Sequence, residues 1–248
     1  MPLLLFDIDG TLVDAFGAGR KAVEDAFRDV TGSPVDSGGF SFSGKTDPQI
    51  VRDLLKEHGF PDDGRTGLDA LTERVLDRYA ERLAVTIAEK RVEALPGTSH
   101  LLGALAQHED LLLGLLTGNL ERTAHLKLSG AGLADVFDSP PGAFGSDDAD
   151  RDRLVPVAAR RAEEQTGRAF SGGDIVVIGD TPRDVACGKR TARAPSASAP
   201  GATTAPTSTP PAPISSSTTS PTRSASKTSP NRKTQNVQRK THYCCVKS

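Results

Sequence analysis

Two aspartates near the amino terminus are the residues of this chain best suited to covalent chemistry. Asp7 and Asp9 stand in the sequence Asp-Ile-Asp-Gly-Thr, directly after the apolar run Leu3–Phe6. Side chains two positions apart on an extended chain point the same way, so the two carboxylates face one site. One can attack as a nucleophile while the other transfers a proton. An isolated pair of this kind also occurs in turns, where it caps backbone amides.

Polar residues follow two later apolar runs in the same manner. Leu111–Leu116 ends in Thr117-Gly118-Asn119, and Ile175–Ile178 ends in Gly179-Asp180, with Asp184 close behind. The runs alternate with helical patterns, which predicts a parallel α/β sheet whose ligands bind beyond the carboxyl ends of its strands. The three polar clusters are therefore expected to meet at one edge of that sheet.

These motifs, in this order, resemble those of the haloacid dehalogenase superfamily, in particular its phosphoglycolate-phosphatase-like branch with a helical cap. The resemblance covers residues 1–188. It implies that Asp7 is the nucleophile, that Asp9 is the general acid and base, and that Thr117 binds the phosphoryl group. Gly118 and Asn119 would complete the phosphoryl-binding loop, with the backbone amide of Asn119 as a donor.

The resemblance also implies a magnesium site. Mg²⁺ would be held by the side chains of Asp7 and Asp180 and by the backbone carbonyl of Asp9, oxygen ligands that suit its octahedral coordination. Asp184 would bind the metal directly, bind it through water or orient Asp180; a role as helix-start cap is the other interpretation. The implied reaction forms an aspartyl-phosphate on Asp7.

The sequence departs from the family at its third motif, where a lysine usually precedes the helix before the fourth strand. Here the stretch reads Asp150-Arg151-Asp152-Arg153-Leu154. Arg151 is the best replacement, because a guanidinium can hold carboxylate and phosphoryl oxygens bidentately. Arg153 and Lys127 are the alternatives, and surface charge at a helix start is the remaining interpretation.

Asp9 separates activities within the superfamily. Its dehalogenases attack carbon, release a halide that needs no acid, and lack the second aspartate. Asp9 therefore favours a phosphatase acting on a small phosphorylated metabolite, with Mg²⁺ as cofactor. A phosphosugar mutase shares the same motifs and is the alternative within the superfamily.

The residues between the first motif and the later ones are expected to form a helical cap. Apolar residues recur at helical spacing in three stretches, and no strand pattern interrupts residues 15–90. The predicted fold is an open, mostly parallel Rossmann-like α/β core at residues 1–14 and 92–188, with an all-helical cap inserted at 15–90. The helices are expected near 22–31, 47–58 and 68–84 in the cap.

One further motif is a false lead. The sequence of residues 39–46 fits the phosphate-loop consensus G-x-x-x-x-G-K-[ST], but no buried strand precedes it, as such a loop requires. In the resembling family this segment is a cap loop that faces the site. Lys45 is therefore a candidate substrate contact, and a solvated lysine is the alternative.

Composition changes sharply after Gly188. All 32 Asp and Glu residues precede it, whereas ten of the 30 Lys and Arg residues and eight of the 17 prolines follow it. Residues 189–248 contain few apolar side chains and are predicted to be a disordered basic tail. The core would then end after its fourth strand, leaving Ile175–Ile178 as an exposed edge.

The tail has three interpretations. A reading-frame shift near Lys189 is our hypothesis, because the resembling fold continues with a helix end and a fifth strand. A genuine disordered tail is the second, and a nucleic-acid-binding arm on a catalytically impaired body is the third. The tail lacks interleaved aromatic residues and the body is acidic, so nucleic acid is not an expected partner.

The remaining features exclude other classes of protein. No apolar run approaches the roughly 18 residues of a membrane span, and the first apolar run is too short for a signal peptide. Three cysteines give neither a disulfide framework nor zinc-site spacing. A cytoplasmic protein is expected, and its oligomeric state stays open.

Overall fold

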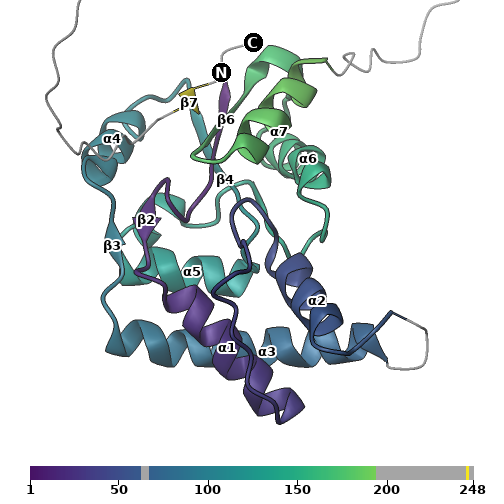
Figure 1. Ribbon diagram of the computed structural model, residues 1–248. Helices are drawn as coiled ribbons and strands as arrows, with labels where there is room; N and C mark the ends of the chain where they lie inside the picture. The colour runs from purple at the N-terminus through teal and green to yellow at the C-terminus, as the bar shows by residue number, and fades with distance from the viewer. Residues whose placement is uncertain (63–66, 194–243, 246–248) are drawn as a thin grey trace, which may run out of the picture. The chain divides into compact units, whose positions relative to one another are not determined.

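A parallel sheet lies at the centre of the core (Figure 1). We describe it from a computed structural model in which residues 1–62, 67–193 and 244–245 are placed. The strands lie in the order β5-β4-β1-β6-β7, with the first four parallel and β7 antiparallel to β6. Their bounds are β1 Leu3–Phe6, β4 Leu112–Leu116, β5 Gly142–Ala143, β6 Ile175–Gly179 and β7 Cys244–Cys245. The predicted open, mostly parallel α/β fold is confirmed.

The register of the central strands brings their carboxyl ends level. Phe6 lies opposite both Leu115 and Ile178, so β1 ends beside β4 and β6. The N–H of Asp7 then donates to the carbonyl oxygen of Ile178 at 2.9 Å, which extends the ladder by one bond. The polar residues that follow the three strands are thereby gathered at one edge of the sheet, as the sequence predicts.

Alternation along β1 buries both faces of the sheet. Leu3 and Leu5 belong to an apolar cluster with residues of the two helices that begin at Leu154 and Pro182. Phe6 belongs to a second cluster, which includes Leu102. Strands buried on both faces are typical of parallel sheets covered by helices. The core helices are α4 Thr98–Leu105, α5 Glu121–Gly130, α6 Leu154–Thr166 and α7 Pro182–Arg193, with 3-10 turns at Ala134–Phe137, Arg151–Arg153 and Gly172–Asp174.

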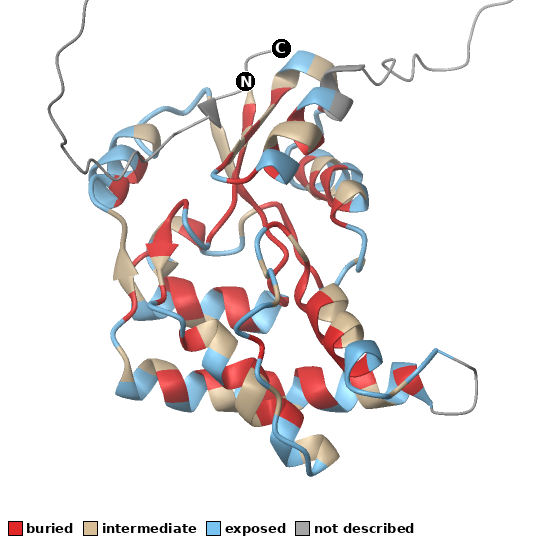
Figure 2. Cartoon of the chain, in the orientation of Figure 1, coloured by how far each residue is buried: buried red, intermediate tan, exposed pale blue. Residues whose placement is uncertain are grey.

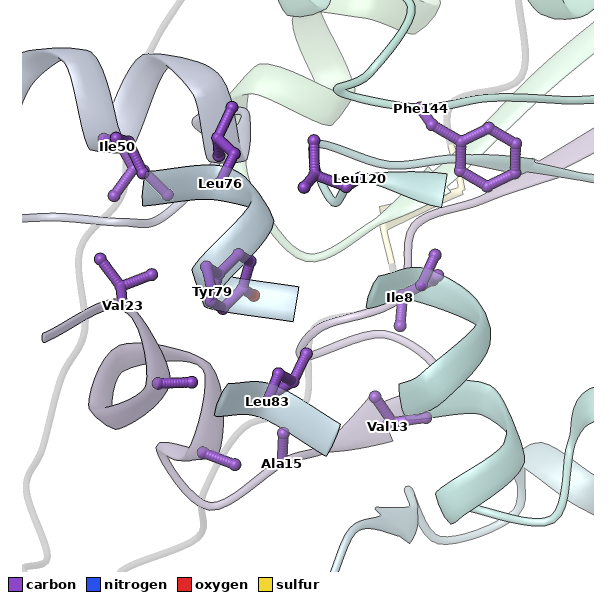
Figure 3. Close-up of a cluster of buried hydrophobic side chains, with 14 of the residues drawn as sticks. Ile8, Val13, Ala15, Val23, Ile50, Leu76, Tyr79, Leu83, Leu120 and Phe144 are labelled. Carbon is purple, nitrogen blue, oxygen red and sulfur yellow. The ribbon is translucent and has the colours of Figure 1, made fainter. Parts of the chain in front are cut away.

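Three helices form the cap beside the carboxyl edge of the sheet (Figure 1). They are α1 Ala18–Thr31, α2 Asp47–Glu57 and α3 Leu68–Glu89, so α3 is five residues longer than predicted. Their buried stripes face one another and the core (Figure 2). Figure 3 shows cap residues such as Val23 and Tyr79 in one apolar cluster with Ile8 and Leu120 of the core. The cap therefore shares its hydrophobic interior with the core.

A short antiparallel ribbon joins the two ends of the cap. Its strands, β2 Val13–Asp14 and β3 Glu93–Ala94, contain two residues each. We did not predict this ribbon, because an alternating pattern cannot be recognised in two residues. It closes the insertion at residues 13 and 94, close to the predicted cap boundaries of 15 and 90.

The carboxyl end of the described chain differs from the predicted one in two respects. The helix α7 continues to Arg193, five residues beyond Gly188. The predicted exposed edge of β6 is corrected at its carboxyl end, where Ile178 and Gly179 pair with Cys245 and Cys244. The rest of the predicted tail lies outside the described residues. Within the described part, no helix is long and apolar enough to cross a bilayer.

Two glycines allow three backbone segments to meet above the sheet. A Cβ atom added to Gly118 would lie 2.2 Å from the carbonyl oxygen of Lys45, and one added to Gly145 would lie 2.1 Å from that of Gly118. The N–H of Asp47 donates to the carbonyl oxygen of Gly118 at 2.7 Å. Backbone atoms cannot retreat as the end of a flexible side chain can. The loop after β4 is thus held between the cap loop and the chain that follows β5.

We expect Gly145→Ala to lower the free energy of unfolding by about 2 kcal/mol, because the added methyl group forces two backbone segments apart. Gly103→Ala is the matched control, since an added Cβ there meets no atom within 4 Å. Gly103 lies inside the helix α4, where alanine should stabilise by about 0.5–1 kcal/mol. Urea unfolding of both variants checks the pair, and equal changes would contradict the close backbone approach at Gly145.

Candidate functional site

The polar residues predicted from the sequence line one cavity of about 400 Å³ between the core and the cap. Each of the three strand ends contributes to its wall, and the cap contributes the opposite side. The predicted site residues in this lining are Asp7, Asp9, Lys45, Thr117, Gly118, Asn119, Arg151 and Asp180, joined by Lys127. Asp184 does not line the cavity but lies directly behind it, in contact with Arg151.

Asp7 is buried at the end of β1 and makes two polar contacts through different oxygens. The N–H of Ile8 donates to its Oδ1 at 2.8 Å, and Nη2 of Arg151 lies 3.0 Å from its Oδ2. Burial raises the pKa of Asp7 to about 6; the charge of Arg151 opposes this rise, and the charges of Asp184 and Asp9 add to it. The side chain is therefore mainly a carboxylate at neutral pH and carries few hydrogen bonds that would weaken it as a nucleophile.

Arg151 is the buried cation beside Asp7. Its Nη2 lies 2.5 Å from Oδ1 of Asp184 as well, so one guanidinium nitrogen joins two carboxylates. Burial opposes its charge, but Asp7 and Asp184 raise the pKa of Arg151 above its already high usual value. A 3-10 turn positions Arg151, and the side chain of Asp150 caps that turn by accepting from the N–H of Asp152.

The other two cations considered for this place lie elsewhere. The side chain of Arg153 is 72% exposed and pairs loosely with Asp148 and Asp150, away from the cavity. Lys127 is in the cavity, but its Nζ contacts Asp9 at 2.6 Å rather than Asp7. Of the three candidates, only Arg151 is placed to act on Asp7.

Three carboxylates could hold a metal ion. One oxygen each of Asp7, Asp180 and Asp184 can be chosen so that the three lie within 4.8 Å of one another. Gly10, whose φ of 79° favours glycine, comes close to one of these carboxylates: a Cβ atom added there would lie 2.6 Å from Oδ2 of Asp180. Burial also raises the pKa of Asp180. Carboxylate oxygens are the ligands that Mg²⁺ prefers, and the donor set fits such an ion.

Asp184 is held more firmly than the other two acidic residues. Its Oδ1 accepts from Arg151, and its Oδ2 accepts from the backbone N–H and the hydroxyl of Thr181 at 3.0 and 2.6 Å. A Cβ atom added to Gly179 would overlap it at 2.3 Å. Both oxygens are thus engaged by protein donors, which favours an orienting role over direct metal binding.

Asp9 lines the same cavity but has a set of contacts separate from those of Asp7. Its Oδ2 accepts from Nδ2 of Asn119 at 2.8 Å and from Nζ of Lys127 at 2.6 Å. Nδ2 of Asn119 also donates to the hydroxyl oxygen of Thr117 at 2.8 Å. The two aspartates of the first motif therefore have different cationic partners, Arg151 for Asp7 and Lys127 for Asp9.

The family profile of haloacid dehalogenase-like hydrolases matches residues 4–194, which is most of the chain. The chain belongs to this family. No curated protein matches it. The matched range includes the strands β1, β4, β5 and β6 and the three helices α1, α2 and α3 that lie between β2 and β3.

Several solved structures share this fold at low sequence identity. A hydrolase from Pseudomonas syringae shares 22% identity at a TM-score of 0.56, with 77% of this chain and 81% of that chain covered. CbbY from Rhodobacter sphaeroides in complex with phosphate shares 18% at a TM-score of 0.58, covering 76% and 82%. A mutant of CbbY in complex with xylulose-1,5-bisphosphate gives 18% and 0.51, covering 70% and 80%.

Lys45 lies in the cavity of this hydrolase but is already paired. Its Nζ is 2.9 Å from Oδ2 of Asp53 and 4.0 Å from the ring centre of Phe40. Its side chain is 19% exposed, so it is less solvated than the alternative interpretation of a solvated lysine supposes. A direct contact with substrate stays a prediction.

Asp47 is a site residue that the sequence did not reveal. Its buried carboxylate accepts from the N–H of Leu120 at 2.9 Å and from the hydroxyl of Thr123 at 3.1 Å, which caps the start of α5 from the cap domain. Burial raises the pKa of Asp47 to about 6, and the charge of Lys127 opposes this rise. In the sequence it is an ordinary acidic residue in the first turn of α2, so no local signal marks it.

Asp47 gives a prediction with a definite sign. Its pKa in the folded protein lies above the usual 3.8, so between pH 4 and 6 the folded chain keeps a proton that the unfolded chain has lost. Asp47 therefore lowers stability as the pH rises through that window. Replacing it by Asn removes this loss and keeps an acceptor, so the free energy of unfolding of Asp47→Asn relative to wild type should rise by about 2 kcal/mol between pH 4 and 7.

Urea unfolding at the two pH values measures this difference. Asp62→Asn is the control, because hydrogen bonds from Arg52 and Lys56 lower the pKa of Asp62 and should give a change of opposite sign. The pKa shift of Asp7 is present in all three proteins and cancels in the comparison. If the difference in the free energy of unfolding between Asp47→Asn and wild type does not vary with pH, folding does not raise the pKa of Asp47.

Proposed function

We propose that this hydrolase cleaves a small phosphate monoester by way of an aspartyl-phosphate on Asp7, with Mg²⁺ as cofactor. The observation that carries the proposal is the separation of the two aspartates of one motif. Asp7 is buried beside Arg151, and Asp9 faces the cavity beside Asn119 and Lys127. One carboxylate is thus available for attack and the other for proton transfer.

A phosphate monoester is an anion, so its approach to a carboxylate needs cationic partners. Arg151 is one of them, since its guanidinium is next to Asp7 and lines the cavity. Mg²⁺, held by Asp7 and Asp180 with the backbone carbonyl of Asp9, would supply further positive charge to the phosphoryl oxygens when bound. The acidic cluster at Asp7, Asp180 and Asp184 supports this metal.

The protein groups that take part in the covalent steps all line the cavity. An oxygen of Asp7 forms a bond to phosphorus while the bond from phosphorus to the leaving oxygen breaks, and Asp9 gives that oxygen its proton. Asp9 next takes a proton from a water molecule that attacks phosphorus, which frees phosphate and restores Asp7. The hydroxyl of Thr117, the backbone amide of Asn119 and Arg151 would bind the other phosphoryl oxygens.

The substrate class is supported by the size of the cavity and by the structural relatives. A volume of about 400 Å³ suits a metabolite rather than a phosphoprotein. CbbY, which shares the fold, has been seen with phosphate and with xylulose-1,5-bisphosphate. We therefore expect a phosphorylated metabolite of comparable size as the substrate of this chain.

The test measures phosphate release from a panel of phosphorylated metabolites, with Mg²⁺ and with a chelator. We expect turnover that requires the metal and that falls by at least about a thousandfold in Asp7→Asn, because the nucleophile is lost. Asp62→Asn, on the surface of the cap, should retain wild-type rates. Turnover that persists in Asp7→Asn would overturn the nucleophile, and conversion of a phosphosugar into an isomer without phosphate release would identify a mutase.

A further inference from the structure

Lys127 is a buried lysine on α5 whose ammonium group lies in the candidate site. The side chain is 5% exposed, and its Nζ lies 2.6 Å from Oδ2 of Asp9 and 2.6 Å from Oδ1 of Asn119. A buried ammonium is costly to the fold unless charged and polar partners surround it. Water does not solvate this ammonium group, so its contacts with Asp9 and Asn119 must stabilise it.

The contacts of Lys127 close a ring with Asn119 and Asp9. Nζ donates to both of them, and Nδ2 of Asn119 donates in turn to the same oxygen of Asp9 at 2.8 Å. Asn119 is itself tied to the hydroxyl of Thr117. Two donors thus fix Oδ2 of Asp9 from different directions, which restricts rotation of the carboxylate.

The rest of the Asp9 side chain is free to act. It is 46% exposed towards the cavity, and among the described residues no donor is bonded to its Oδ1. A carboxylate in the cavity wall that has one oxygen bound and the other without a protein donor can exchange a proton with a ligand there. Without the two donors, a half-exposed side chain would occupy several rotamers.

The cap helices cover Lys127. A Cβ atom added to Gly19 of α1 would lie 3.6 Å from its Nζ and 3.7 Å from the hydroxyl oxygen of Tyr79 of α3. Nζ thus lies where the core meets two cap helices, with little access to water. Low solvent exposure strengthens a charged hydrogen bond, so the cap supports the contact between Lys127 and Asp9.

We propose that Lys127 is a positioning residue, which with Asn119 holds the carboxylate of Asp9 in the orientation needed for proton transfer to the leaving group. The inference rests on the proposed phosphatase function. It gives the two buried cations separate tasks: Arg151 acts at the nucleophile, and Lys127 acts on the acid and base. Lys127 itself touches neither phosphorus nor the leaving oxygen in this scheme.

The test uses aryl phosphates of similar shape whose leaving groups differ in acidity. Phenyl phosphate needs a proton on its leaving oxygen, whereas 2,4-dinitrophenyl phosphate does not. In Lys127→Met we expect kcat/KM for phenyl phosphate to fall about 10–100-fold and kcat/KM for the dinitrophenyl ester to change little, since general acid catalysis is worth about 10²–10⁴ in rate. Lys127→Gln keeps a donor and should lie between Lys127→Met and the wild type.

Lys21→Met is the matched control, because Lys21 is a half-exposed lysine of the cap that pairs with Asp25 away from the cavity. It should leave both rates unchanged. Equal losses on the two esters in Lys127→Met and Lys127→Gln would overturn the inference and assign the pair to the fold alone. Thermal melts of all variants accompany the assay, and Lys127→Gln decides if Lys127→Met does not fold.

Measuring Asp7→Asn on the same two esters distinguishes failure of this inference from failure of the proposed function on which it rests. If Asp7→Asn hydrolyses both esters as fast as the wild type, the aspartyl-phosphate route is overturned. If Asp7→Asn is inactive and the Lys127 variants show no dependence on the leaving group, only the positioning role falls.

Discussion

The guanidinium of Arg151 lies between two buried carboxylates, 3.0 Å from Asp7 and 2.5 Å from Asp184, and the rest of the site is arranged around this contact. Parallel strands that end level bring Asp7, Asp180 and Asp184 within a few ångströms of one another. Such a concentration of acidic groups opposes folding through mutual repulsion and loss of hydration. A cation in the middle offsets both costs, and a bound divalent metal would offset them further.

Lys127 is the second buried cation of the site, and it lies beside Asp9. The cation beside Asp9 is not Arg151, which already contacts both Asp7 and Asp184. Lys127 approaches from α5 instead, and the cap covers it. Asp47, from the cap, bonds to the start of the same helix. The cap is therefore a structural part of the candidate site, which agrees with the apolar cluster that core and cap share (Figure 3).

Much of this arrangement could be predicted from local sequence patterns, and the part that could not has a common physical cause. Asp7, Thr117 and Asp180 each follow a short apolar run, so strand ends and their polar residues are visible in the sequence. The partner of Asp7 was open among Arg151, Arg153 and Lys127, since each lies near a helix and carries the same charge. Only tertiary packing shows that Arg151 turns inward while Arg153 is exposed.

Asp47 and the ribbon of β2 and β3 illustrate the same limit. Asp47 has the sequence context of a common helix start, and its burial against α5 depends on where the cap meets the core. The ribbon has two residues in each strand, too few for any periodicity, and forms because both ends of the cap insertion leave the core at one place. Contacts between distant segments are what single-sequence patterns do not contain.

In the proposed mechanism, the separation of the two cations bears on how one Asp-x-Asp motif would supply both a nucleophile and an acid. Two carboxylates on one strand end would share a proton between them if they stood in the same environment. Here Asp7 is buried, with a backbone amide on one oxygen and a guanidinium beside the other, whereas Asp9 is half-exposed and bound by an ammonium and an amide. Different surroundings would give these two chemically identical groups the different tasks that we propose for them. The sequence distance that places them together is two residues, and the cations that distinguish them come from two helical segments far along the chain.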